Sequence, residues 1–297
     1  GTGAGPSAGT GGSTATSGGA GTALPVDINQ AIETAARQID AGDVPTAFAA
    51  LEPALAAHPD DSSLLAMRGV AESIYTGRDV ARVTIDRAVS LGPNNALAFF
   101  ARGYLNERDS QADAAIADYT RAIELDPSFA RAYYRRSSVL NYPKDDREGA
   151  RRDLDRAIEL DPDYVPARMD RAWWQYYANE FEPALADLEH VLKLDAKQAQ
   201  AIYLRALIAA RQDRPADAQR DFDAAVAAAP EDEGILRGRG EFLVRQGQLE
   251  KALADAEKLV EADAANSDRQ RIRGFILVAL GRNQQALESF ERAVLID

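Results

Sequence analysis

The sequence of 297 residues contains no cysteine and only two histidines, His58 and His190. Without cysteine, a disulfide framework, a thiol nucleophile and a thiolate metal site are all excluded. Neither histidine belongs to a cluster of metal ligands, and each is expected to be a solvated residue on a helix end or face rather than an acid or base. We therefore predict no enzyme activity, no catalytic residue, no metal and no cofactor.

Long apolar runs and an excess of positive charge are also missing. No run approaches the roughly 18 residues of a membrane span, and no apolar region of a secretory signal is present, so no transmembrane segment is predicted in this chain. The chain has 34 basic and 47 acidic residues, a formal net charge of -13. Because wrapping a phosphate backbone requires a dense positive surface, nucleic acid is disfavoured as a partner, and so is an anionic membrane surface.

The amino-terminal segment differs from the rest of the chain. Its first 26 residues carry no charge and contain nine of the 21 glycines. Such a stretch cannot bury enough apolar surface to offset its ordering entropy, so residues 1–27 are predicted to form a flexible Gly/Ser/Thr-rich linker. The chain begins at Gly1 rather than Met, and we expect a processed or trimmed start with an anchor or another domain upstream. Together with the lack of cysteine, this favours the bacterial cell envelope or periplasm over the cytoplasm.

The remaining residues repeat with a fixed period. The segment RAIELDP occurs at 121–127 and again at 156–162. A marker alanine recurs every 34 residues, with one step of 35, at Ala47, Ala81, Ala115, Ala150, Ala184, Ala218, Ala252 and Ala286. Twelve residues earlier, or thirteen in the longer repeat, stands a small residue: Ala35, Gly69, Gly103, Ser137, Ala172, Ala206, Gly240 or Gly274. Small residues at fixed places in consecutive helices let the two backbones approach closely.

Apolar residues follow each marker alanine at helical spacing. The residue four positions later is Leu51, Ile85, Tyr119, Leu154, Leu188, Phe222, Ala256 or Phe290, and a further apolar residue follows after three more positions. These offsets indicate one buried helical stripe. Proline closes most repeats, because it cannot continue a helix. Carboxylates such as Asp146 and Asp232 fall between the predicted helices, where they are expected to cap helix N-termini.

This pattern resembles the tetratricopeptide repeat (TPR) family, whose unit is a pair of antiparallel helices of 34 residues. The resemblance implies an all-α fold, a right-handed α-solenoid of eight units over residues 28–297. The extra residue of the fourth unit is expected in the turn at 141–146. The sequence stops after a second helix, without a closing helix, so we expect either further repeats beyond it or an exposed unit that meets a partner or a second copy.

The resemblance also implies a binding surface. In TPR proteins the second, fifth, ninth and twelfth positions of each unit line a concave groove. The predicted groove residues, together with an arginine next to this stripe, are Phe100, Tyr104, Arg131, Tyr134, Arg135, Met169, Trp173, Tyr176, Tyr203 and Leu207. Tyr, Trp and Arg frequently anchor bound partners, which favours a binding surface; the alternative is that these rings belong to the core.

The two arginines lie in the segment ARAYYRR, which looks like the part of chaperone-binding TPR domains that grips a peptide C-terminus. Other donor positions of that clamp hold Ala66, Val70 and Ala101 in this sequence, so chaperone-tail binding is not expected. Arg131 and Arg135 are instead predicted either to pair with an acidic segment of a partner or to form ion pairs with a neighbouring unit. Further basic residues along the groove are Arg237, Arg245 and Arg271.

The function predicted from these features is a protein–protein interaction scaffold that binds an extended or helical peptide in the concave groove. One alternative is a docking or regulatory region of a larger enzyme whose catalytic domain lies outside this chain. Another is a structural assembly factor of the bacterial envelope. The sequence does not identify the partner, because groove chemistry varies freely on a constant frame.

Overall fold

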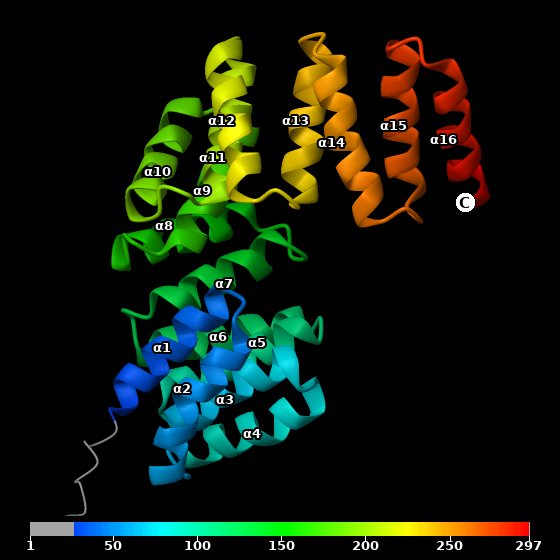
Figure 1. Ribbon diagram of the computed structural model, residues 1–297. Coiled ribbons are helices and arrows are strands. Elements are labelled where there is room, and N and C mark those ends of the chain that lie inside the picture. Colours follow the sequence, from blue (N-terminus) through cyan, green and yellow to red (C-terminus); the bar gives the residue numbers. More distant parts are fainter. Residues whose placement is uncertain (1–26, 297) are drawn as a thin grey trace, which may run out of the picture.

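The computed structural model describes residues 27–296 and has only α-helices as regular secondary structure in that range (Figure 1). The predicted linker therefore lies, except for Asp27, outside the described residues. The helices are α1 (Ile28–Asp40), α2 (Val44–Ala57), α3 (Ser62–Tyr75), α4 (Arg78–Leu91), α5 (Ala96–Arg108), α6 (Ala112–Leu125), α7 (Ala130–Asn141), α8 (Arg147–Leu160), α9 (Val165–Tyr177), α10 (Phe181–Leu194), α11 (Ala199–Arg211), α12 (Pro215–Ala228), α13 (Glu233–Arg245), α14 (Leu249–Ala262), α15 (Ser267–Ala279) and α16 (Asn283–Ile296). None of them is long and apolar enough to cross a membrane.

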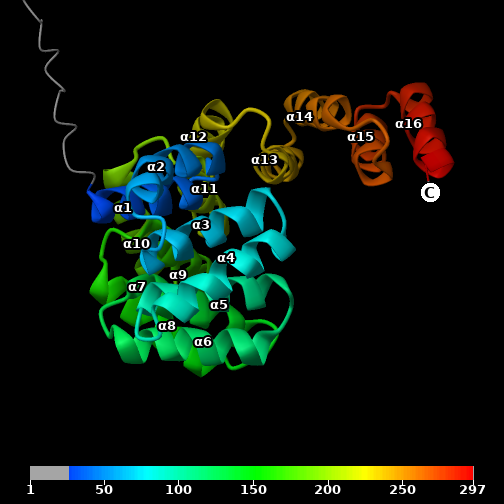
Figure 2. The ribbon, with the colours of Figure 1, turned by 90° about the horizontal axis from the view of Figure 1, so that it is seen from below.

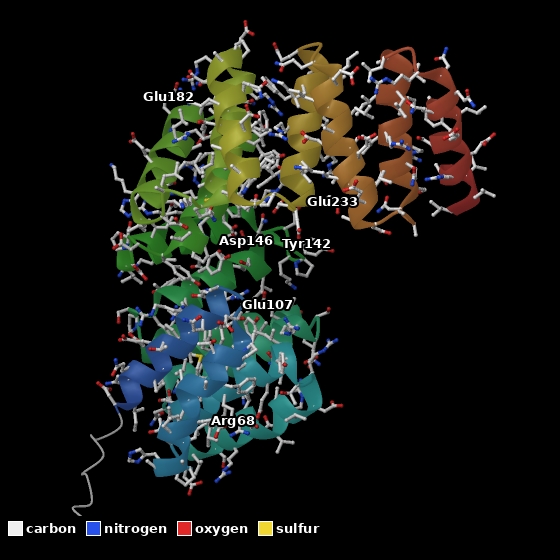
Figure 3. The ribbon with its side chains drawn as sticks, viewed as in Figure 1. Arg68, Glu107, Tyr142, Asp146, Glu182 and Glu233 are labelled. Atoms are coloured by element: carbon white, nitrogen blue, oxygen red, sulfur yellow. The ribbon has the colours of Figure 1, made fainter. Side chains whose placement is uncertain are left out.

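Consecutive helices pair into eight helical hairpins, which stack into a solenoid as predicted. The carboxylates between helices cap N-termini: Asp146 accepts a hydrogen bond from the Gly149 backbone N–H at 2.9 Å, and Asp232 accepts one from Ile235 at 2.9 Å. The extra residue of the fourth unit lies in the longer turn between α7 and α8, where Figure 3 labels Tyr142 and Asp146.

The core of each hairpin is built on the marker alanine and the small residue that precedes it. All eight marker alanines are buried. A Cβ atom added to Gly103 would lie only 2.8 Å from the Tyr119 ring, and one added to Gly274 would lie 2.6 Å from the Phe290 ring. A glycine at this position therefore accommodates the large side chain of the second helix, which explains why the two positions occur together in the repeat.

A ladder of partly buried ion pairs accompanies this packing. In five consecutive units, the arginine just before the small residue pairs with an aspartate three residues after the marker alanine, with N–O distances of 2.5 to 2.7 Å. The pairs are Arg102–Asp118, Arg136–Asp153, Arg171–Asp187, Arg205–Asp221 and Arg239–Asp255. The aspartates are buried, and the hydrogen bond to Asp118 raises the pKa of Arg102 above its ordinary value. The sequence analysis did not identify this ladder.

The solenoid has two differently shaped parts. Helices α1 to α7 form a tight block in which the start of α7 reaches the end of α1: Arg131 on α7 donates to Asp40 on α1, across 91 residues of sequence. Helices α13 to α16 instead extend away from the block as an arm (Figures 1 and 2). Helices α8 to α12 connect the two parts.

Candidate functional site

The concave side of the first four units is filled by the protein's own side chains. The space between α1, α3, α5 and α7 is reduced to about 20 Å³. Phe100 and Tyr104 line it and are buried, and Tyr164, from the turn before α9, is also buried there. The rings of Tyr134 and Tyr164 meet edge to face, with 5.3 Å between centroids. Little of the predicted groove is therefore open in this part of the solenoid.

Both predicted groove arginines have carboxylate partners within the chain. The Arg131 guanidinium donates from Nη2 and Nε to Asp40 Oδ2 at 2.7 and 3.2 Å. Arg135 lies 4.7 Å above the ring centroid of Tyr104, and its Nη1 is 3.7 Å from Glu107 Oε1. The ion-pair alternative raised from the sequence describes these contacts, although Asp40 belongs to the first unit rather than to a neighbouring one.

A half-buried polar pair lies beside these arginines. The Tyr134 hydroxyl hydrogen-bonds to the carboxylate of Asp170 on α9. Burial raises the pKa of Asp170 above its ordinary value, whereas the hydrogen bond from Tyr134 and the charge of Arg135 act in the opposite direction. Burial also raises the pKa of Tyr134 well above its ordinary range. Tyr134 therefore contributes to the internal packing between α7 and α9.

The ten predicted groove residues divide by exposure. Those that are buried are Phe100, Tyr104, Met169 and Tyr176, and those that are half-buried are Arg131, Tyr134, Arg135, Trp173, Tyr203 and Leu207. The half-buried apolar residues of this set lie on α9 and α11, apart from Tyr134. The accessible part of the predicted surface is therefore concentrated after the first four units.

An aromatic cluster forms this accessible part. Trp173 stacks on Tyr177, with 5.9 Å between centroids, and its ring is 6.2 Å from that of Tyr203. Tyr177 is 71% exposed, so one side of the cluster faces solvent. The Tyr203 ring extends to α13, where a Cβ added to Gly238 would lie 2.3 Å from its hydroxyl oxygen. Gly238 thus lets the aromatic surface continue from α11 onto α13.

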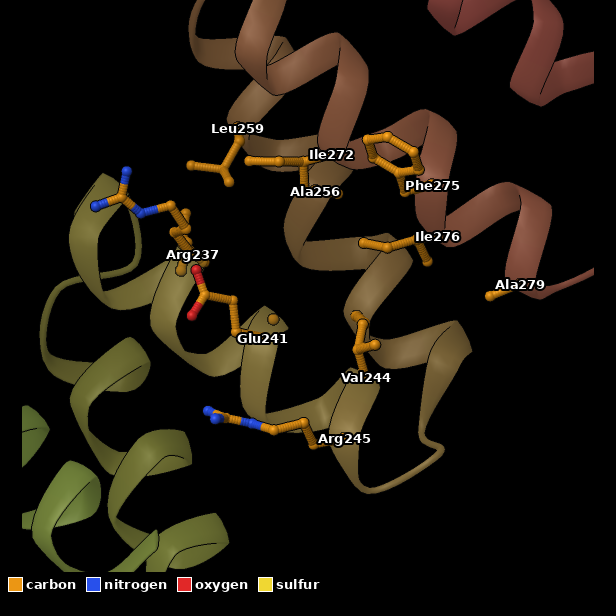
Figure 4. Close-up of a pocket in the computed structure, with 13 residues that line it drawn as sticks. Arg237, Glu241, Val244, Arg245, Ala256, Leu259, Ile272, Phe275, Ile276 and Ala279 are labelled. Carbon is orange, nitrogen blue, oxygen red and sulfur yellow. The ribbon is translucent and has the colours of Figure 1, made fainter. Parts of the chain in front are cut away.

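Beyond this contact, an open pocket of about 430 Å³ lies between α13 and α15 (Figure 4). Its floor is formed by α14, and the lining residues are Leu236, Arg237, Gly240, Glu241, Val244, Arg245, Ala252, Ala256, Leu259, Ile272, Phe275, Ile276 and Ala279. A volume of this size falls within the range of about 300–1,000 Å³ that ligand pockets occupy. At its edge, Phe275 is 65% exposed.

The pocket has a direct cause in the repeat pattern. In the units that place Gly103 and Gly274 at the helix crossing, a tyrosine or a phenylalanine of the second helix occupies the space over the glycine. In the seventh unit both positions are small, because Gly240 faces Ala256, and a Cβ added to Gly240 would meet nothing within 4 Å. The missing side chain leaves space that the neighbouring α15 does not close.

Charged residues border the pocket only along α13. Arg237, Glu241 and Arg245 are exposed and line it, and Figure 4 shows all three on this helix. Within residues 27–296, the side chains of Arg237 and Arg245 form no ion pair or hydrogen bond, whereas Arg239 on the same helix binds Asp255 and Asp223. Arg271 on α15, also expected to line the groove, pairs with Asp268.

The sequence analysis did not predict this pocket, although the signal was present. Ala256 is the one small residue in a series of eight positions otherwise occupied by Leu, Ile, Tyr or Phe. A small residue at that position opposite a glycine indicates unfilled volume in the seventh unit. Phe275 was not predicted either, because the aromatic residues assigned to the groove all lie between Phe100 and Tyr203.

Comparison with solved structures shows the same fold at low sequence identity. A chain of the APC/C hetero-tetramer Cut9–Hcn1 matches with a TM-score of 0.73 and 10% identity; the match covers 93% of this chain, which spans only 54% of that one. PilW, a type IV pilus biogenesis factor, matches with a TM-score of 0.58 and 19% identity, over 65% of this chain and 90% of PilW. PilF of Pseudomonas aeruginosa matches with a TM-score of 0.57 and 14% identity, over 65% of this chain and 88% of PilF. The comparison with curated proteins gives no match.

Family models identify the repeat directly. Tetratricopeptide-repeat models match residues 77–130, 130–164 and 203–267, which together make up just over half of the 297 residues. These matched segments cover α4 to α8 and most of α11 to α14 of the solenoid. Repeats of this kind support a role as a protein–protein interaction scaffold. The chain belongs to the tetratricopeptide repeat family.

Proposed function

We propose that this protein binds a peptide segment of a partner protein on the concave surface that runs from α9 to α15. The observation that carries the proposal is the difference in accessibility along that surface. The space enclosed by the first four units is filled. The later units present exposed Tyr177 in the aromatic cluster, and exposed Val244 and Phe275 at the open pocket. Exposed apolar surface that is rimmed by polar residues is typical of binding sites.

The arrangement suits an elongated ligand rather than a compact one. The aromatic cluster of α9 and α11 and the pocket between α13 and α15 lie on successive units, and a smaller hollow of about 140 Å³ lies beside Leu207 and Arg245. An extended or helical segment can contact several such places at once. Aromatic anchors contribute affinity at low entropic cost, since each has few rotatable bonds.

A dodecapeptide library displayed on phage, selected against the full chain, tests this proposal. Selected peptides are then synthesised with a fluorescent label, and their affinities are measured by fluorescence anisotropy. Replacing Tyr177 and Phe275 together by serine should weaken binding about tenfold or more, because residues of this type often carry most of the binding energy. Both side chains are largely exposed, so the helical circular dichroism should stay unchanged.

Val83 provides a matched control, since it is 73% exposed on α4, away from the proposed surface. Replacing Val83 by serine should leave peptide affinity unchanged. The proposal fails if the wild-type chain enriches no peptide, or if the Tyr177 and Phe275 double variant binds the selected peptides as tightly as the wild type.

A further inference from the structure

The open pocket of the seventh unit has an apolar interior. Ala252, Ala256 and Leu259 of α14 form its floor, and all three are buried at the base of the space. Ile272 and Ile276 of α15 form the facing wall. Every residue that α14 and α15 contribute to the lining is apolar, so this part of the pocket offers no side-chain hydrogen bond to a polar group. A polar side chain placed there would lose its hydrogen bonds to water without replacement.

The mouth of the pocket has a different character. Arg237 and Arg245 lie about two helical turns apart on α13 and are exposed, and neither pairs with a carboxylate in the described part of the chain. Glu241 lies between them. The other arginine of this helix, Arg239, is held by two aspartates and faces a different side. The mouth therefore presents two cations that are available to a partner within a protein that is acidic overall.

We infer that this pocket takes one large aliphatic or aromatic side chain of the bound peptide, and that acidic residues flanking that side chain pair with Arg237 and Arg245. The inference rests on the proposed function and specifies the chemistry of its ligand. Charge complementarity favours an acidic segment, because it would be attracted to these two arginines and would form forked hydrogen bonds with them. The apolar anchor supplies affinity, and the acidic flanks set its register.

The repeat itself suggests how to block the pocket. Phe222 and Phe290 occupy the position of Ala256 in the units on either side. Phe222 is fully buried, and Phe290 packs over Gly274 of its own hairpin. The substitution Ala256→Phe should therefore place a ring over Gly240 and fill the space from within. Ala254 is exposed on the same helix and does not line the pocket, so Ala254→Phe is a matched control.

The same phage-displayed dodecapeptide library is selected in parallel on the full-length wild type, on Ala256→Phe and on Ala254→Phe, and the enriched peptides are sequenced. The wild type and the control should enrich a large apolar residue flanked by Asp or Glu. Peptides of this kind should bind Ala256→Phe about tenfold or more weakly than they bind the wild type, because the anchor loses its buried contacts. If circular dichroism shows that Ala256→Phe is not folded, Ala256→Leu replaces it, since leucine occupies this position in three other units.

A second pair of variants tests the charges. In the double variant Arg237→Glu with Arg245→Glu, the preference for acidic flanks should be lost or reversed toward Lys and Arg, while the apolar anchor is retained. Lys251→Glu, an exposed charge reversal on α14 outside the pocket, should change neither preference.

The outcomes separate this inference from the proposed function. If selected peptides depend on Tyr177 and Phe275 but show the same anchor and flank preferences on Ala256→Phe, the peptide-binding surface stands and the pocket assignment is overturned. If no peptide is enriched on the wild type, the proposed function itself fails. Sedimentation provides a further test: a concentration-dependent dimer that Ala256→Phe abolishes would identify a second copy as the occupant and would overturn the peptide assignment.

Discussion

Units 3 and 7 use the same helical hairpin and the same glycine at the helix crossing, but they differ in what lies opposite that glycine. In unit 3 the Tyr119 ring occupies the space over Gly103, and its hydroxyl donates to Glu107 at 2.6 Å. In unit 7 Ala256 leaves the space over Gly240 open, and the pocket forms there. One side chain therefore decides whether a unit of this solenoid is closed or can receive a ligand.

The same contrast holds for the two halves of the molecule. In the first half, α7 reaches α1 through Arg131 and Asp40, and the rings that point inward bury one another. In the second half, α13 and α15 are separated by the pocket, and Phe275 stays exposed. A solenoid can thus fill its concave surface with its own side chains in one region and leave that surface open for binding in another.

The largest expected effect comes from placing an alanine opposite Gly103 in unit 3, as Ala256 lies opposite Gly240 in unit 7. Tyr119→Ala removes a fully buried ring and should lower the free energy of unfolding by about 3–5 kcal/mol, the usual cost of a large aromatic cavity. Urea denaturation followed by circular dichroism measures it. A loss below about 1 kcal/mol would mean that the glycine and its partner ring do not stabilise the hairpin as described.

The reverse change gives unit 7 a glycine opposite a phenylalanine, the pair that Gly274 and Phe290 form in unit 8. Ala256→Phe should raise the free energy of unfolding by about 0.5–2 kcal/mol, which is typical of cavity filling. Ala254→Phe, on the exposed face of α14, should change it by less than about 0.5 kcal/mol. Destabilisation by Ala256→Phe with a normal Ala254→Phe would show that the pocket cannot accept a ring.

A smaller effect is expected where the first half closes on itself. A double-mutant cycle with Arg131→Ala and Asp40→Ala should give a coupling of about 0.5–1 kcal/mol, because both side chains are partly exposed to solvent. Hydrogen exchange should also accelerate in α1 when the pair is broken. The ion pair between Arg87 and Asp60 is much more exposed, and its coupling should be close to zero. Equal coupling for the two pairs would contradict a special role for the contact between α7 and α1.

The smallest effect concerns pH. Burial raises the folded-state pKa of Asp170 above the ordinary value of 3.8, so the folded chain holds this proton more tightly than the unfolded chain does. The stability that protonated Asp170 contributes is therefore fully present below the unfolded-state pKa of 3.8, and it is lost as the pH rises through the higher folded-state pKa. Asp170→Asn removes this decrease, and its stability relative to the wild type should increase between pH 4 and pH 7 in urea denaturation. A constant difference over that range would contradict the raised pKa.

Much of the fold could be predicted from local sequence pattern. The marker alanines and the small residues twelve positions earlier indicated the hairpins and their crossing points, and both the helical solenoid and the family are confirmed. The candidate site was harder to predict. Phe100 and Tyr104 occupy groove positions but are buried, because Phe129 and Arg135 of the next unit pack against their rings. Position within a unit indicates which way a side chain points, but not whether other units cover it.

By itself, the sequence determined the period, the helical hairpins and the pairing of small with large residues, because these depend on hydrogen bonds and contacts within about one repeat. Only the tertiary structure decided where the concave surface closes and where it stays open. Small rotations between adjacent units accumulate along a solenoid, so contacts such as Arg131 with Asp40 depend on every interface between them. The pocket at Gly240 and Ala256 depends on both sequence and tertiary structure. The sequence shows that a large side chain is missing there, but only the tertiary structure shows that α13 and α15 are far enough apart to leave the space open.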